Sequence, residues 1–192
     1  VYGMTDNYSK ISKYKQLAKK KLKYFALIGD LYMEEADFKN AAIYYHKAID
    51  NGILAYTALG DTYDYRHQYK KSFDTYLKGT EEGEIESFVR LAYCYQNGHA
   101  TKENIGKAIE YYTKASNMGS ALASRNLGDL YYFDMPIKES ETENIKSAVK
   151  FYERAFYLGD IQIAKKIGFI YLNDKELANI DKAIEWYEKG LS

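Results

Sequence analysis

The sequence has little cysteine, little proline and no long apolar segment. Its 192 residues include one cysteine and one proline. A single cysteine excludes a disulfide framework within the chain. No apolar run approaches the roughly 18 residues of a membrane-spanning helix, and the first residues lack the pattern of a secretory signal peptide. Small disulfide-rich and membrane-spanning classes are therefore not indicated.

Charge of either sign is not in excess. The chain has 27 basic and 27 acidic residues, so no global field attracts it to nucleic acid or to a membrane surface. We therefore expect no nucleic-acid partner and no membrane span. Because the sequence starts at Val1 rather than Met, the expected compartment stays open: soluble and cytoplasmic, or exported or periplasmic if a signal was trimmed.

Tyrosine, with 22 copies, is the abundant residue, and it recurs with small residues at fixed spacing. From Ala108, tyrosine follows at +4, alanine at +7, and glycine at +11 and +20. Closely similar steps start at Ala41, Ser72 and Ala148, and a fifth copy begins at Ala183. Residues at +4 and +7 share one face of a helix. A tandem repeat of this kind predicts stacked helix pairs in one continuous solenoid.

The spacing predicts five pairs, each with a first helix (helix A) and a second (helix B). The expected ranges are 23–34/38–50, 54–65/69–81, 85–96/105–117, 121–133/145–158 and 161–173/180–191. Helix A has glycine in its middle in four pairs: Gly29, Gly60, Gly128 and Gly168. Glycine inside a helix costs about 1 kcal/mol relative to alanine. Its recurrence indicates that another helix backbone approaches closely there.

Start signals for helix B recur as well. Asp37, Asn104, Asn144 and Asn179 are expected to be N-caps, whereas Gln68 departs from the pattern and predicts the weakest start.

Two segments lie outside the repeat pattern. Residues 1–8 are expected to be frayed, followed by a helix from Ser9 to Lys20, and seven lysines lie between Lys10 and Lys23. We interpret these lysines as a solvated helix face, with an anionic docking patch as the alternative. The turn from Asp134 to Glu143 carries the only proline, Pro136, and is either a tolerated surface loop or a binding elaboration.

The repeated motifs resemble the Sel1-like repeat, a relative of the tetratricopeptide repeat. The third unit matches best, through Lys107-Ala108, Tyr111-Tyr112, Lys114-Ala115 and Gly119. The first two units have the shorter, tetratricopeptide-like spacing of 12 residues from glycine to small residue. The resemblance implies an all-α, right-handed superhelical α-solenoid of about five units over residues 23–192, after an N-terminal extension over 1–22 that holds a degraded or truncated half-repeat.

No catalytic, metal or cofactor site is predicted. His46, His67 and His99 occupy unrelated repeat positions without metal-ligand spacing, and Cys94 occupies a small core position. The glycines lie at helix crossings and caps, not in a phosphate-binding loop. We therefore expect a protein that is not an enzyme.

The expected binding surface lies on helix A. In tetratricopeptide-type superhelices the A helices line a concave groove, so the resemblance implies that the residues one and four positions after the mid-helix glycine face it. The candidates are Asp30, Asp61, Asp64, Tyr93, Asp129, Tyr132 and Phe169. Our hypothesis is that an extended peptide or partner helix binds with basic groups toward the N-terminal aspartates and an apolar anchor toward Tyr132 and Phe169. The alternative is that these are ordinary exposed residues.

The expected function is that of a protein–protein interaction scaffold or adaptor with a protein or peptide partner. One alternative is a non-catalytic accessory or regulator of a cell-envelope enzyme that binds a small cell-wall fragment. Another, RNA binding, predicts a basic concave face, which the aspartates argue against. Weak self-association through the C-terminal end is a further alternative, with Phe156, Trp186 and Leu191 as candidates for exposure.

Overall fold

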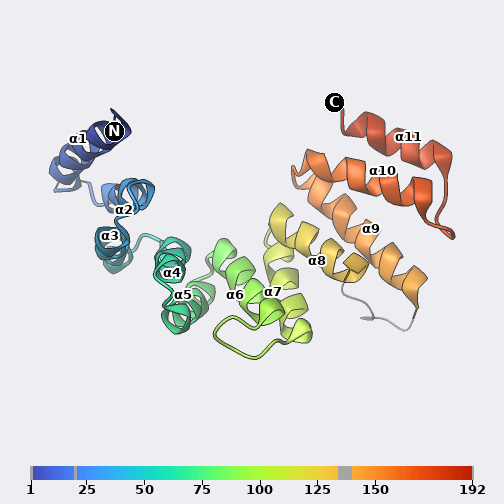
Figure 1. Ribbon diagram of the computed structural model, residues 1–192, viewed down its shortest axis with the longest axis horizontal. Helices are drawn as coiled ribbons and strands as arrows, with labels where there is room; N and C mark the ends of the chain where they lie inside the picture. The colour runs from blue at the N-terminus through green and yellow to red at the C-terminus, as the bar shows by residue number, and fades with distance from the viewer. Residues whose placement is uncertain (1, 20, 134–139, 192) are drawn as a thin grey trace. The chain divides into compact units, whose positions relative to one another are not determined.

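The computed structural model describes residues 2–19, 21–133 and 140–191, with side chains from Asp6 onward. Within these ranges the chain forms eleven α-helices and one short 3-10 helix, without a strand (Figure 1). None of these helices combines the length and apolar character needed to cross a membrane. The chain divides into two compact units, residues 1–104 and 105–192. The prediction of an all-α helical repeat fold is confirmed.

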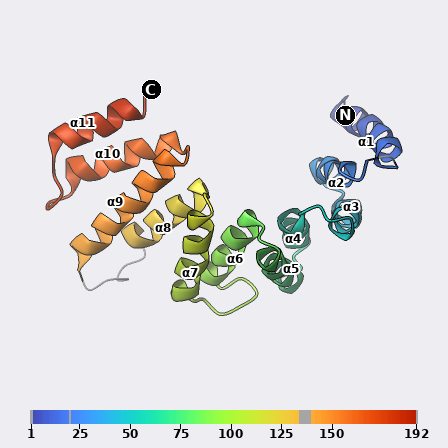
Figure 2. The same ribbon diagram turned by 180° about the vertical axis from the view of Figure 1, so that it is seen from behind.

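The first unit contains six helices: α1 (Tyr2–Ala18), α2 (Tyr24–Glu34), α3 (Phe38–Asp50), α4 (Tyr56–Tyr65), α5 (Tyr69–Glu81) and α6 (Ile85–Asn97). Figures 1 and 2 show α2 with α3, and α4 with α5, as adjacent hairpins. Helix α1 begins at Tyr2, so the expectation of a frayed start, which covered residues 1–8, was wrong for residues 2–8. It packs on α2 through buried Ile11 and Ala18, and the ring of Tyr14 stacks on Tyr24 at 5.4 Å.

The second unit contains α7 (Ile105–Asn117), α8 (Ala121–Phe133), α9 (Glu141–Tyr157), the 3-10 helix η1 (Ile161–Ile163), α10 (Ala164–Asn173) and α11 (Ile180–Lys189). Helix α9 begins four residues before the predicted start at Ile145. Most of the long turn, including Pro136, lies at 134–139 and so outside the described residues.

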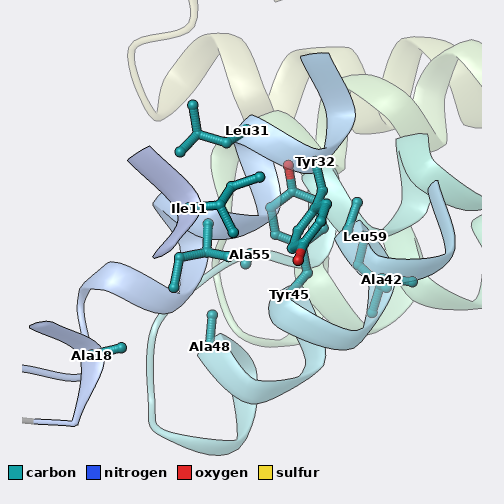
Figure 3. Packing of buried hydrophobic residues seen from close by; sticks show 11 residues of the cluster. Ile11, Ala18, Leu31, Tyr32, Ala42, Tyr45, Ala48, Ala55 and Leu59 are labelled. Atoms are coloured by element: carbon teal, nitrogen blue, oxygen red, sulfur yellow. The ribbon is translucent and has the colours of Figure 1, made fainter. Parts of the chain in front are cut away.

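Tyrosines form much of the buried core. In the first unit, Tyr32 and Tyr45 are 5% and 2% exposed. Figure 3 shows them at the centre of their cluster, with Ile11 on one side and Leu59 on the other. In the second unit, Tyr152 is fully buried in a cluster with Ile167 and Trp186. The repeat therefore uses tyrosine as a core residue, which accounts for part of its abundance.

At three of the mid-helix glycines, the nearest atoms belong to a tyrosine ring from helix B and not to a helix backbone as expected. A Cβ atom built on the glycine would lie 2.5, 2.2 and 2.3 Å from a ring carbon in the pairs Gly29–Tyr45, Gly60–Tyr76 and Gly128–Tyr152. Such distances are too short for any real side chain, so only glycine leaves room for the ring. At Gly168 the expected helix backbone does approach: a Cβ there would lie 3.1 Å from the Tyr187 ring and 3.2 Å from the Ala183 carbonyl oxygen, so the site is tight but less crowded than the other three.

The helix ends follow the predicted signals in part. Asp37 and Asn179 are N-caps that accept hydrogen bonds from the backbone N–H of Asn40 and Lys182. Asn144 is not a cap: it is buried inside α9, and its amide donates to the Ser140 carbonyl at 3.1 Å. Gln68 makes no side-chain cap. The glycines expected to end helix B have left-handed φ in four helix pairs: Gly52, Gly83, Gly119 and Gly159.

Substituting alanine for Gly60 tests the glycine–tyrosine contact. We expect Gly60→Ala to lower the free energy of unfolding by about 1–3 kcal/mol, because overpacking outweighs the roughly 1 kcal/mol gain in helix propensity. Gly168→Ala is the comparison variant, with a smaller expected loss, because its Cβ would lie 3.1 Å from the nearest atom and not 2.2 Å. Urea denaturation followed by circular dichroism measures both. Equal stability of Gly60→Ala and the wild type would contradict the contact.

Substituting aspartate for Gln68 tests the missing cap. Gln68 has φ −95° and ψ 56°, close to φ −86° and ψ 67° at Asp37, which does cap its helix. The Oε1 atom of Gln68 is buried, and it has no hydrogen-bond partner among the described residues. We expect Gln68→Asp to raise the free energy of unfolding by about 1 kcal/mol, measured by thermal and urea denaturation. Gln68→Glu brings the same charge on a longer side chain, so an equal gain there would attribute the effect to charge.

Candidate functional site

The seven candidate residues are distributed over the A helices of both units. Asp30, Asp61, Asp64 and Tyr93 belong to α2, α4 and α6, whereas Asp129, Tyr132 and Phe169 belong to α8 and α10. Asp30, Tyr93 and Phe169 are exposed, the last two at 49% and 53%, and the other four are half-buried. A single row running through both units stays a prediction.

Three of the aspartates accept a hydrogen bond from the tyrosine that crosses the neighbouring glycine. The hydroxyl-to-carboxylate distances are 2.8 Å for Tyr45–Asp30, 2.6 Å for Tyr76–Asp61 and 2.7 Å for Tyr152–Asp129. The ring passes the glycine, and its hydroxyl reaches the residue that follows. Sequence reasoning missed this bond, although the Gly-Asp pairs at 29–30, 60–61 and 128–129 were a signal for it.

These tyrosines stay protonated donors. Burial of the ring raises the pKa of Tyr45, Tyr76 and Tyr152 far above its ordinary range, and the adjacent aspartate raises it further. A buried hydroxyl without an acceptor would cost about 1–3 kcal/mol, so the aspartates also contribute to stability.

Two of the aspartates have a cationic partner in addition. Asp61 accepts from the guanidinium of Arg90 at 2.8 Å, and Asp129 pairs with Lys166. These ion pairs neutralise part of the acidic character that the sequence indicated. Asp30 and Asp64 form no salt bridge with the residues that the structure describes.

A hollow in the first unit brings two of the predicted residues together. Its volume is about 360 Å³, and it is lined by Asp61, Asp64, Tyr65, His67, Tyr69 and Arg90. One carboxylate oxygen of Asp64 accepts from Tyr76 at 2.8 Å. Tyr65 and Tyr69 are 63% and 45% exposed. The hollow therefore combines an aspartate that lacks a salt bridge with exposed aromatic surface.

Two histidines extend this aromatic surface toward Tyr93. The Nδ1 atom of His67 lies 2.9 Å from the Tyr69 hydroxyl, within hydrogen-bond distance. The ring of His99 lies 6.0 Å from Tyr69 and 5.6 Å from Tyr93. The sequence placed these histidines at unrelated repeat positions, and Tyr69 contacts both: His67 is two residues away along the chain, whereas tertiary packing brings His99 to the ring. In the described ranges, no three His, Cys, Asp or Glu side chains are arranged to hold a metal ion.

In the second unit, Tyr132 lines a separate hollow of about 300 Å³. Its other lining residues are Glu141 and Ile145 of α9, Ile170 and Asn173 of α10, and Asp174, which follows α10. The ring of Tyr132 packs edge-on against Phe133 at 4.8 Å. The apolar anchor expected here is thus bordered by two acidic side chains.

Cys94 has the properties of a core residue. It is 4% exposed on α6, and burial raises the pKa of its thiol to about 12. A thiol that is protonated and buried is a poor nucleophile at neutral pH.

The candidates for exposure at the C-terminal end differ among themselves. Trp186 is only 4% exposed and packs edge-on against half-buried Phe156 at 5.3 Å, so this candidate is buried. Leu191 is 82% exposed.

Family comparisons agree with this geometry. The Sel1 repeat family model matches residues 89–120, 121–160 and 166–192, and a tetratricopeptide repeat model matches residues 22–51. The tetratricopeptide match covers the first helix pair, α2 and α3, whose shorter spacing from glycine to small residue indicated a tetratricopeptide-like repeat. No curated protein matches the chain.

Solved structures share the fold at low sequence identity. A Sel1 repeat protein from Oxalobacter formigenes has a TM-score of 0.72 at 24% identity, with coverage of 88% of this chain and 71% of that one. A protective antigen of uropathogenic Escherichia coli with an SLR fold has a TM-score of 0.71 at 23% identity. That match covers 94% of this chain but 40% of the antigen. A putative Sel1 repeat protein from Klebsiella pneumoniae subsp. pneumoniae has a TM-score of 0.61 at 19% identity, covering 94% and 91% of the two chains.

The buried tyrosines predict a loss of stability in alkali. Their folded-state pKa lies above the unfolded value of about 10, so their contribution is complete below pH 10 and falls as pH rises above it. Each such tyrosine lowers the free energy of unfolding by about 1.4 kcal/mol per pH unit in that range. We expect Tyr76→Phe to be less stable at neutral pH but to lose stability less steeply between pH 10 and 12, measured by urea denaturation. An unchanged slope would show that Tyr76 ionises normally.

Proposed function

The chain belongs to the Sel1 repeat family, and on that premise we propose that it is an interaction scaffold that binds an extended peptide or a partner helix on its A helices. The Sel1 and tetratricopeptide repeat fold generally mediates protein–protein interaction, and its members are typically non-catalytic scaffolds. In such arrays each unit mainly buries its neighbours, so specificity comes from exposed side chains.

The observation that carries this proposal is the hollow around Asp64 in the first unit. Asp64 forms no salt bridge with the described residues, since Arg90 in the same hollow pairs with Asp61, and exposed Tyr65 and Tyr69 lie beside it. Tyrosine beside a charged residue is typical of binding hot spots, because the ring supplies contact area at a low cost in conformational entropy.

The arrangement favours a ligand with a basic side chain. A lysine or arginine of the ligand would approach Asp64, while its neighbouring residues pack on Tyr65 and Tyr69. Asp61 contributes less charge, because Arg90 already pairs with it at 2.8 Å. Asp30 is exposed on α2 and offers a further carboxylate along the same unit.

For the second unit we propose a contact of more apolar character. Phe169 is 53% exposed and Tyr132 lines a hollow with Ile145 and Ile170. Asp129 is committed to Tyr152 and Lys166, so it serves packing more than ligand binding.

A random twelve-residue peptide library selected on the purified protein tests the proposal. We expect the selected peptides to combine lysine or arginine with an aromatic or aliphatic neighbour. Asp64→Asn removes the charge but keeps an acceptor for Tyr76, and Tyr69→Ser removes a ring. Each should weaken binding about tenfold or more, measured by calorimetry or fluorescence anisotropy.

Asp74→Asn is the matched control. Asp74 lies on α5 outside the hollow and is 52% exposed, so its loss changes the net charge equally. Wild-type affinity for this variant, with loss for Asp64→Asn, would support a local site. Selected peptides that bind Asp64→Asn and Tyr69→Ser as tightly as the wild type would refute the hollow as the binding surface.

A further inference from the structure

A second hollow in the first unit is lined by lysines and lies on α1, α2 and α3. Its lining residues, which we call the lysine pocket, are Lys15, Ala18, Lys19, Phe25, Tyr44 and Lys47, and its volume is about 250 Å³. Lys15 and Lys19 belong to the lysine-rich segment between Lys10 and Lys23, and Lys47 comes from α3. The fold thus brings a third lysine to two that are close in sequence.

Two aromatic rings contact the ammonium groups of Lys15 and Lys47. The Nζ atom of Lys15 donates to the Tyr32 hydroxyl at 2.7 Å and lies 5.5 Å from the centre of the Tyr44 ring. The Nζ atom of Lys47 lies 4.6 Å from the same ring. Cation–π contacts of this kind fix a charge without neutralising it. The hydrogen bond to Tyr32 also raises the pKa of Lys15, which keeps it protonated.

The lysine pocket lacks the carboxylates that other lysines of this chain have. Among the described residues, lysine salt bridges include Lys10–Asp6, Lys70–Asp74, Lys114–Glu110, Lys166–Asp129 and Lys189–Glu185. No aspartate or glutamate lines the lysine pocket, and none pairs with Lys15, Lys19 or Lys47 among the described residues. Three like charges around one hollow repel each other, and an incoming anion would relieve that repulsion.

The aromatic rings argue against a nucleobase as the ligand. Tyr44 stacks on Tyr32 with 5.6 Å between centroids, and the ammonium groups of Lys15 and Lys47 lie over its ring. Phe25 packs tilted against Tyr44 at 6.4 Å. Single-stranded nucleic acid needs open ring faces on which bases stack, and these rings are already in contact. The apolar surface of Ala18 and Phe25 instead suits the methylene groups of an acidic side chain.

From this geometry we propose that the lysine pocket binds an acidic peptide segment, with at least two aspartate or glutamate carboxylates placed between Lys15, Lys19 and Lys47. The pocket is distinct from the surface of the proposed function. On α2, Phe25 and Asp30 are five residues apart, which places them about 140° apart around the helix. The first unit therefore has a basic site and an acidic site on different sides of the same helix.

Fluorescence anisotropy with a labelled peptide of eight glutamates tests the proposal on the whole protein. We expect binding that weakens as ionic strength rises, because the lysines are exposed. The triple variant Lys15→Gln, Lys19→Gln, Lys47→Gln should lose affinity tenfold or more. Circular dichroism melting checks that this variant is folded, and Lys47→Arg, which keeps the charge, should retain binding.

The matched control is the triple variant Lys39→Gln, Lys78→Gln, Lys102→Gln. These lysines are exposed in the same unit, outside the lysine pocket, so net charge changes equally. Affinity within about threefold of the wild type is expected there. Equal losses in the two triple variants, or no binding of octaglutamate, would overturn the proposal. So would stronger binding of a twelve-nucleotide oligouridine or of inorganic phosphate, which would assign the pocket to a different ligand. The Asp64→Asn variant should bind octaglutamate as the wild type does, which separates this test from that of the proposed function.

Discussion

The contact between a helix-B tyrosine and a helix-A glycine governs how the helix pairs of this chain pack. The ring occupies the space where a Cβ atom would lie, 2.2 Å away at Gly60, and its hydroxyl reaches the aspartate that follows the glycine. A buried phenol requires an acceptor, and the aspartate supplies it. Glycine, tyrosine and aspartate therefore act as one structural set in three pairs, and a change in any one of them affects the other two.

This constraint limits the chemistry available for binding. An aspartate that accepts from a buried tyrosine and also pairs with a cation, as Asp61 does with Arg90, has little charge left for a ligand. Asp64 differs, because one oxygen accepts from Tyr76 and no salt bridge neutralises it among the described residues. The residues that we propose for partner binding are thus those that packing leaves without a salt bridge.

The first unit shows how a chain of zero net charge can present charged surfaces of both signs. Its lysine pocket on α1 to α3 lacks carboxylates, and its hollow on α4 to α6 contains Asp64 beside exposed tyrosines. Equal numbers of acidic and basic residues exclude a strong global field but not local ones. The two sites that we propose would thus take segments of opposite charge.

The sequence by itself determined the repeat, the helix pairs and the glycines at their turns, because these follow from spacing within one helix or one turn. It also placed Asp37 and Asn179 at helix starts, since capping depends on neighbours a few residues away. Tertiary structure alone decided what fills the space at Gly60, which carboxylates are neutralised, and that Lys47 joins Lys15 and Lys19. These outcomes depend on side chains from different helices. The packing of the helices sets the distances between those side chains, and spacing along the chain does not encode them.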